Sequence, residues 1–272
     1  MRTIAICNLK GGVAKTTTVV NLAAILARDF GKRVLVIDAD SQGNATSFLG
    51  GDREAAGMAA LLRGEVSGEN PVALQETNVE GVRLIPGSPE LMDLDLTKAG
   101  NGSANVYCLL SLRALLEKAP QPGDGSPILF GEPFDCCLID CPPAFNAASS
   151  AALVAADEVL IPVKLDAFAL EGMANLMQQI ANMRRINPRL RVLGLLPVMW
   201  YGSEAITRAE QALRESGLPL LPRIRRSDRV DDMTYAQAPL IVCSPRSGAC
   251  QDYRRLARTL AGQAKKGGAE NG

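Results

Sequence analysis

Histidine is missing from the 272 residues of this chain. Its absence excludes a catalytic triad with a histidine base, a zinc centre with histidine ligands and a histidine general acid. No apolar run reaches the roughly 18 residues that a membrane-spanning helix needs. The first residues also lack the apolar segment and cleavage site of a signal peptide, so we expect the mature chain to begin at or near Met1.

The seven cysteines are an odd number and lack the density of a disulfide scaffold, which favours a reducing cytosol. Cys136, Cys137 and Cys141 lie close together in the sequence, but the chain has no C-x-x-C pair. Because Cys136 and Cys137 fall inside an apolar run, we interpret them as small buried residues rather than as ligands of a metal cluster.

The formal net charge is zero, from 29 basic and 29 acidic residues, but the charges are unevenly distributed. Residues 184–258 hold 14 arginines, no lysine and 7 acidic residues. Such a basic surface suits a polyanion such as nucleic acid. A solvated arginine face with carboxylate neighbours is the alternative that charge alone favours.

Short apolar runs alternate with longer amphipathic stretches. The runs expected to form strands are Thr3–Cys7, Arg33–Ile37, Val82–Ile85, Cys136–Ile139, Glu158–Val163, Arg191–Leu196 and Leu218–Leu221. The helical patterns lie at Thr16–Arg28, Asn105–Lys118, Leu170–Arg185, Ser203–Ser216 and Ser247–Ala264. This alternation predicts an α/β fold, three-layered and doubly wound around a mostly parallel sheet. No linker divides the chain, so we expect a single domain over residues 1–264 and a flexible tail over residues 265–272.

The segment after the first predicted strand has the layout of a Walker A loop: a glycine turn, a lysine, a threonine and then a helix. Glycines let backbone N–H groups converge on phosphate oxygens, and the start of the helix adds its positive dipole end. Lys15 can reach the β- and γ-phosphates, and the Thr16 hydroxyl can bind Mg²⁺. The residues expected to bind the nucleotide here are Lys10, Gly11, Gly12, Val13, Ala14, Lys15, Thr16 and Thr17. The loop predicts a P-loop NTPase with ATP and Mg²⁺ as cofactors.

The stretch KGGVAKTTTVVNLAAILA resembles the deviant Walker A loop of the ParA/MinD family of partition ATPases, which begins with a second, signature lysine, here Lys10. VLVIDADSQGNAT is similar to the family's switch I, and LIDCPP to its Walker B and switch II. The resemblance covers nearly the whole chain and is strongest to ParA-type (Soj-like) proteins that lack an N-terminal helix-turn-helix. Ala14 departs from the general Walker A pattern, which has glycine there, but this family commonly has alanine at that place. Two residues depart from the family pattern: Ser41 stands where proline is usual, and Leu9 where a polar residue is usual.

Three aspartates follow predicted strands, at the edge where open α/β sheets bind ligands. Asp38 and Asp40 are two residues apart at a strand end and so face the same side. The resemblance implies that Asp40 orients the attacking water and that Asp38 supports the metal and its water shell. Asp140 matches the Walker B position, which holds Mg²⁺ through water. A helix cap after a strand is the alternative for each aspartate. The expected metal site thus comprises Thr16, Asp38, Asp40 and Asp140, and the expected catalytic residues are Lys10, Lys15 and Asp40.

Lys10 is the residue on which the predicted mechanism depends. Cations near the leaving oxygen lower the barrier to phosphoryl transfer. The resemblance implies that two subunits sandwich two ATP molecules and that each lends Lys10 to its partner's nucleotide, so that the homodimer depends on ATP. A solvated charge beside the loop is the alternative.

The segment PRIRRSDR holds Arg223, Arg225, Arg226 and Arg229 and resembles the family stretch that contacts the DNA backbone. Arginine pairs bidentately with phosphate, and contacts of this kind read no sequence. The family's other DNA-binding arginine has no counterpart, and Glu204 lies near its place. By resemblance, the same region holds the adenine between Met199 and Pro222, with ordinary core and turn residues as an equally favoured alternative.

These features predict an ATP-dependent partition switch. The homodimer would bind DNA non-specifically and hydrolyse ATP when a centromere-binding ParB-like protein stimulates it, so as to segregate plasmid, chromosome or integrative-element DNA. We expect a cytoplasmic protein, associated with the nucleoid when ATP is bound, and no membrane partner. The alternatives are a MinD-like membrane-associated positioning ATPase, which the weak apolar face of Leu256–Lys266 disfavours, and a nucleotide-binding scaffold with little turnover.

Overall fold

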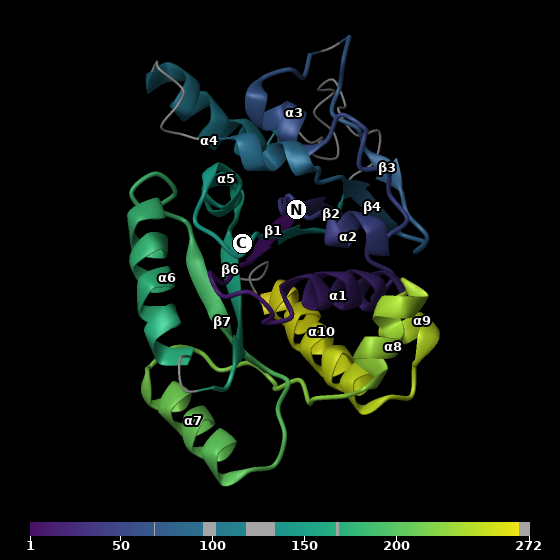
Figure 1. Ribbon diagram of the computed structural model, residues 1–272, viewed down its shortest axis with the longest axis vertical. Helices are drawn as coiled ribbons and strands as arrows, with labels where there is room; N and C mark the ends of the chain where they lie inside the picture. The colour runs from purple at the N-terminus through teal and green to yellow at the C-terminus, as the bar shows by residue number, and fades with distance from the viewer. Residues whose placement is uncertain (68, 95–101, 118–133, 167–168, 267–272) are drawn as a thin grey trace.

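The computed structural model describes residues 1–67, 69–94, 102–117, 134–166 and 169–266. In these residues a seven-stranded sheet runs through the molecule, with helices on both faces (Figure 1). Its strands are β1 (Arg2–Ile6), β2 (Val34–Asp38), β3 (Gln75–Glu76), β4 (Val82–Ile85), β5 (Cys136–Asp140), β6 (Glu158–Lys164) and β7 (Arg191–Val198). Their order is β3-β4-β2-β5-β1-β6-β7, and all neighbours are parallel except β3 and β4. The predicted fold class is confirmed.

Each face of the sheet has its own apolar core. One core joins the sheet to α1 (Lys15–Phe30), α8 (Arg229–Ala236), α9 (Leu240–Cys243) and α10 (Gly248–Lys266). Figure 1 shows α1 and α10 side by side beneath the sheet. The other core holds α3 (Met58–Arg63), α4 (Gly102–Glu117), α5 (Ala147–Ala155), α6 (Ala169–Met183) and α7 (Glu204–Glu215). The short α2 (Asn44–Phe48) and the 3₁₀ helix η1 (Pro89–Asp93) follow β2 and β4.

The register of the sheet places the carboxylates beside the phosphate loop. β1 lies between β5 and β6, and Ile6, its last residue, is the partner of Asp140 at the end of β5. Asp140 is in turn the partner of Asp38 at the end of β2. Because parallel strands end at one edge, both aspartates and the loop that leaves β1 meet there.

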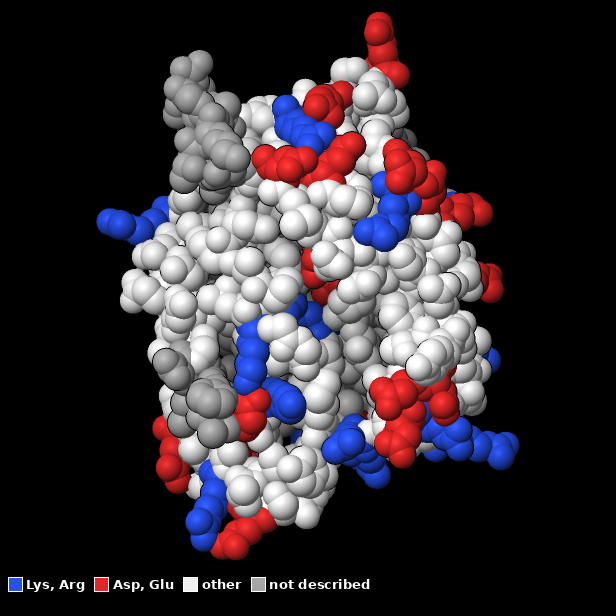
Figure 2. All heavy atoms as spheres, viewed as in Figure 1, with Lys and Arg blue, Asp and Glu red and all other residues white. Residues whose placement is uncertain are grey.

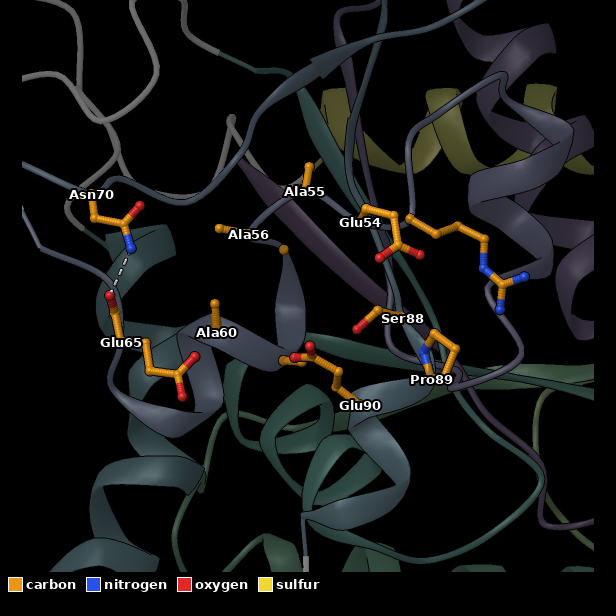
Figure 3. Close-up of a pocket in the computed structure, with 12 residues that line it drawn as sticks. Glu54, Ala55, Ala56, Ala60, Glu65, Asn70, Ser88, Pro89 and Glu90 are labelled. Carbon is orange, nitrogen blue, oxygen red and sulfur yellow. Dashed lines mark hydrogen bonds between the residues drawn. The ribbon is translucent and has the colours of Figure 1, made fainter.

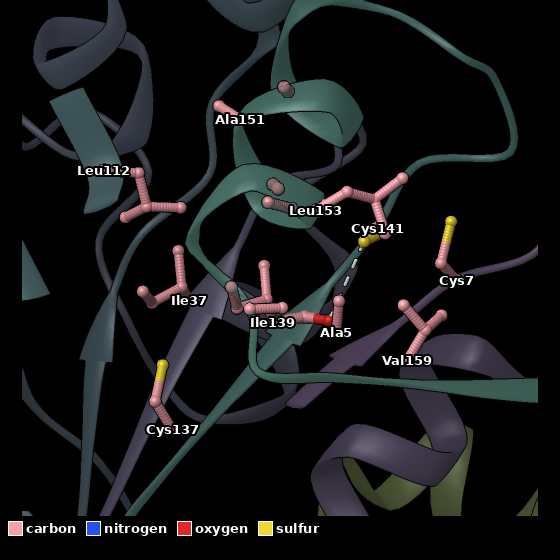
Figure 4. Packing of buried hydrophobic residues seen from close by; sticks show 14 of the residues in the cluster. Ala5, Cys7, Ile37, Leu112, Cys137, Ile139, Cys141, Ala151, Leu153 and Val159 are labelled. Atoms are coloured by element: carbon pink, nitrogen blue, oxygen red, sulfur yellow. Dashed lines mark hydrogen bonds between the residues drawn. The ribbon is translucent and has the colours of Figure 1, made fainter. Parts of the chain in front are cut away.

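The cysteines near β5 belong to the core. Cys137 and Cys141 have no exposed surface, and Figure 4 shows them among apolar side chains such as Ile139 and Leu153. Burial raises the pKa of the Cys137 thiol well above its ordinary value, so the thiol stays neutral. No group of three or more Cys, Asp or Glu residues suited to a metal occurs in the described ranges. The interpretation of Cys137 and Cys141 as buried apolar residues is confirmed, whereas Cys136 is only partly buried.

One predicted strand is wrong. Leu218–Leu221 runs beside β7 but forms only the isolated bridge between Leu195 and Leu220. Pro219 faces β7 but has no N–H to donate, so the ladder does not extend back from this bridge. The structure also adds β3, α2, α3, α5, α8 and α9, which the sequence patterns did not indicate. At the other end, α10 extends to Lys266, and residues 267–272 lie outside the described part.

Candidate nucleotide site

The loop between β1 and α1 is built to receive an anion. Gly12 and Ala14 both adopt left-handed backbone conformations, with φ of 68° and 58°. A left-handed alanine is strained, so the turn before Lys15 is held by its surroundings. No side chain caps the start of α1. The N–H groups of its first turn are therefore available to phosphate oxygens.

Both lysines of the loop are held by their own chain. The Lys15 residue is only 7% exposed, and its Nζ donates to the carbonyl oxygen of Lys10 at 3.1 Å. The Nζ of Lys10 lies 2.5 Å from the Oδ2 atom of Asp166. Asp166 follows β6 and was not predicted as a site residue, although the segment that contains it is similar to the family pattern. On the face of the molecule drawn in Figure 2, Lys and Arg side chains lie near a central hollow, with acidic side chains beside them.

Thr16 and Asp140 form the part of the site that suits a metal ion. The Thr16 hydroxyl donates to Oδ2 of Asp140 at 2.7 Å, while the buried Oδ1 of Asp140 has no hydrogen-bond partner. Burial, followed by the charge of Asp38, raises the pKa of Asp140 well above its ordinary value. A buried carboxylate with an unused oxygen beside a hydroxyl fits Mg²⁺, which takes few protein ligands and keeps several waters.

Asp38 and Asp40 play different local roles. Asp38 is fully buried, and its Oδ2 accepts the Thr46 amide and hydroxyl, both at 2.8 Å. Burial raises the pKa of Asp38 to about 6. These hydrogen bonds hold the start of α2, so a contribution of Asp38 to the metal stays a prediction. Asp40 is 7% exposed and accepts the Gln42 amide through Oδ1 at 3.0 Å.

A cavity of about 340 Å³ opens beside the phosphate loop. Ala14 and Thr17 line it on the loop side, and Met199, Ile224 and Tyr253 supply apolar walls. Of the two residues expected beside the adenine, Met199 lines this cavity and Pro222 is not among the lining residues, so the adenine position stays a prediction. Charged residues such as Arg225 and Asp228 complete the lining, so the cavity offers both apolar and polar surface beside the phosphate loop.

Comparisons with known proteins identify the family of the chain. The AAA domain family matches residues 1–192. The chromosome-partitioning ATPase Soj of Thermus thermophilus is 35% identical, over 96% of this chain and 95% of its own. The chromosome partitioning protein ParA of Caulobacter vibrioides is 34% identical, over 96% and 94% of the two chains. A solved structure of cobyrinic acid a,c-diamide synthase from Mycobacterium smegmatis, with bound ADP and magnesium, is similar at a TM-score of 0.76 and 28% identity, covering 98% of this chain and 96% of that one.

The chain belongs to the ParA/MinD family of deviant Walker A ATPases. That Lys10 is the signature lysine of this family, and Lys15 the P-loop lysine, stays a prediction. Among the described helices, none combines the length and apolar character needed to cross a bilayer.

The four arginines expected to meet DNA differ in this ParA/MinD chain. Arg223 stacks 3.6 Å from the ring centre of Trp200 and pairs with Glu210. The Arg225 guanidinium donates two hydrogen bonds to the buried Asp252, the Arg225 amide donates a third, and Arg229 pairs with Asp232. Within the described residues Arg226 has no ion pair, although it lies on the same loop and lines the cavity beside the phosphate loop.

Proposed function

We propose that this protein is an ATP-dependent DNA partition switch, active as a homodimer that forms around Mg-ATP. The observation that carries the proposal is the convergence of Lys10, Lys15, Thr16 and Asp140 at the carboxyl end of the sheet's central strands. Relatives named as chromosome-partitioning proteins over nearly the full chain support the cellular role.

In the proposed cycle, the N–H groups at the start of α1 and the Lys15 ammonium bind the phosphates. Thr16 and Asp140 would hold Mg²⁺, and the ion would neutralise charge on the phosphate oxygens. Asp40 orients a water molecule for attack on the γ-phosphate. Lys10 leaves Asp166 and binds the nucleotide of the partner subunit, so that hydrolysis removes the bridge between the subunits.

The DNA-bound state is proposed to require ATP. Arg226 would contact phosphates of the DNA backbone without reading sequence. A ParB-like partner would stimulate ATP hydrolysis. ATP binding would thereby control both dimerisation and residence on the nucleoid.

The C-terminal helix favours this role over membrane positioning. Leu256 and Leu260 of α10 are buried in the core shared with α1, at 0% and 3% exposure. The apolar side chains that would have to enter a lipid surface are therefore occupied within the fold.

The test is retention on non-specific duplex DNA with Mg-ATP and with Mg-ADP, after the Asp40→Ala substitution has blocked hydrolysis. We expect retention with ATP alone and its loss in Lys15→Ala, which cannot hold the nucleotide. Equal retention with ADP and ATP would refute the switch. Phosphate release by the unmodified protein with DNA and its partner distinguishes a switch from a scaffold, for which release would stay at background.

A further inference from the structure

The turn after β2 sets the position of Asp40. The carbonyl oxygen of Asp40 accepts the Gly43 amide at 2.9 Å, and its carboxylate accepts the Gln42 amide at 3.0 Å. Gly43 is left-handed, with φ of 58°. A change in the path of residues 41–43 would therefore move the carboxylate.

Arg53 reaches back to this turn from the segment between α2 and α3. Its Nη2 donates to the carbonyl oxygen of Ser41 at 3.4 Å. A side-chain carbon added at Gly43 would lie 2.5 Å from Nε of Arg53, which shows how closely the guanidinium packs against the glycine. Arg53, which precedes α3, thus contacts the turn at both Ser41 and Gly43.

No carboxylate among the described residues holds the Arg53 guanidinium beside the turn. Its Nε is buried and has no hydrogen-bond partner, and no carboxylate of the described residues forms an ion pair with it. Glu54 and Glu90 line the same cavity of about 390 Å³, seen in Figure 3, but Glu90 pairs with Arg63 instead. Among the described residues, the contacts of the Arg53 guanidinium with Ser41 and Gly43 are therefore what positions it.

Ser41 restrains the backbone of the turn only weakly, and Arg53 supplies a further restraint. The Ser41 amide donates no hydrogen bond in the described part of the chain, and serine does not restrict φ as proline does. The restraint on this residue therefore comes from its carbonyl oxygen, through Arg53.

We propose that Arg53 is a positioning residue for ATP hydrolysis, which holds the Ser41–Gly43 turn so that Asp40 faces the attacking water. The inference rests on the proposed function, because it assigns to Asp40 the orientation of that water. Arg53 touches the turn and not the nucleotide site, so its loss should affect the chemical step rather than binding.

The test compares Arg53→Met with the unmodified protein. Methionine keeps the length and the packing against Gly43 but removes the donor. We expect kcat for ATP hydrolysis to fall about tenfold, with the Kd of a non-hydrolysable ATP analogue and the melting temperature unchanged. Ser41→Pro in the Arg53→Met background should recover most of kcat, because proline restores the restraint and sacrifices no hydrogen bond. Arg63→Met, which removes a neighbouring ion pair but leaves the turn intact, is the matched control and should hydrolyse ATP normally.

Amide hydrogen exchange provides a readout that does not need hydrolysis. The amides of Gln42 and Gly43 should exchange faster in Arg53→Met than in the unmodified protein or in Arg63→Met. Unchanged exchange, an unchanged kcat, or a loss of kcat that Ser41→Pro does not repair would overturn the proposal. If the unmodified protein itself releases no phosphate, the proposed function fails, while the exchange measurement still decides whether Arg53 holds the turn.

Discussion

Lys10 and Asp166 form an ion pair within one chain, with the Lys10 Nζ 2.5 Å from the Asp166 Oδ2. Both side chains are partly exposed, at 35% and 29%. A pair of this kind contributes at most about 1 kcal/mol, so the charges of a triphosphate can displace it. Lys10, the residue proposed to join two subunits, is thus held by a weak ion pair with Asp166 of its own chain.

Removal of that partner should promote dimerisation. In Asp166→Asn, Lys10 loses its charged partner, and we expect the ATP concentration at half-maximal dimerisation to fall about threefold. Sedimentation with an ATP analogue measures this. Lys10→Ala is the control and should bind the analogue while remaining monomeric. A higher ATP requirement in Asp166→Asn would show that Asp166 helps the dimer rather than competing with it.

Asp40→Ala should separate binding from turnover. The carboxylate is proposed to orient the attacking water, so we expect phosphate release to fall about 100-fold while ATP is retained and dimers accumulate. Single-turnover phosphate release after mixing with ATP measures the chemical step. Normal release would rule out the role given to Asp40.

Arg226 and Arg225 should behave differently although they are neighbours. Arg226→Ala should weaken DNA retention without a change in melting temperature. The slope of the logarithm of the binding constant against the logarithm of salt concentration should become shallower by about one for each arginine lost. Arg225→Ala breaks the bidentate pair with the buried Asp252 and should lower the free energy of unfolding by about 1–2 kcal/mol. DNA binding at several salt concentrations, alongside thermal melting, distinguishes the two. The opposite pattern would place the DNA contact on Arg225.

The cluster around Glu210 should respond to acid. Glu210 accepts the Trp200 indole N–H at 2.9 Å and pairs with Arg214 and Arg223. Burial acts to raise the pKa of Glu210, but the hydrogen bonds from the two arginines outweigh it and bring the pKa below its ordinary value of 4.5. The carboxylate therefore contributes stability above pH 4.5, and that stability is lost as the pH falls through the lower, folded-state value.

Trp200 is the only tryptophan, so its fluorescence reports on this cluster alone. We expect a change in emission below pH 4.5 that is absent from Glu210→Gln, and a free energy of unfolding about 1–2 kcal/mol lower in that variant at pH 7. The same acid transition in both proteins would contradict the assignment.

The sequence predicts the sheet well because most strands are continuous apolar runs, as in VLVID of β2, and such runs are typical of buried parallel strands. The phosphate loop is predicted for a similar reason, since it is local in sequence. By contrast, α8 was missed because only Met233 of its eight residues is buried, which leaves no apolar stripe to detect.

Side-chain partners in the site could not be predicted from spacing. Lys10 and Asp166 are 156 residues apart, and Arg225 and Asp252 are 27 apart, so their pairing depends on the packed fold. The sequence placed Arg223, Arg225, Arg226 and Arg229 on one segment. Contacts distant in the sequence distinguish Arg226, which lacks an acidic partner in the described ranges, from Arg223 and Arg225. Arg229 instead pairs locally with Asp232, three residues along α8.

Contacts between the N-terminal elements and α10 have a consequence for folding during translation. Arg2 in β1 donates to the carbonyl oxygen of Leu260 in α10, and the hydroxyls of Thr18 and Tyr253 lie 3.2 Å apart between α1 and α10. On the ribosome, the first strand and the helix behind the phosphate loop must wait for α10 to emerge before they gain these contacts. A nascent chain should therefore acquire its affinity for nucleotide only near the completion of translation.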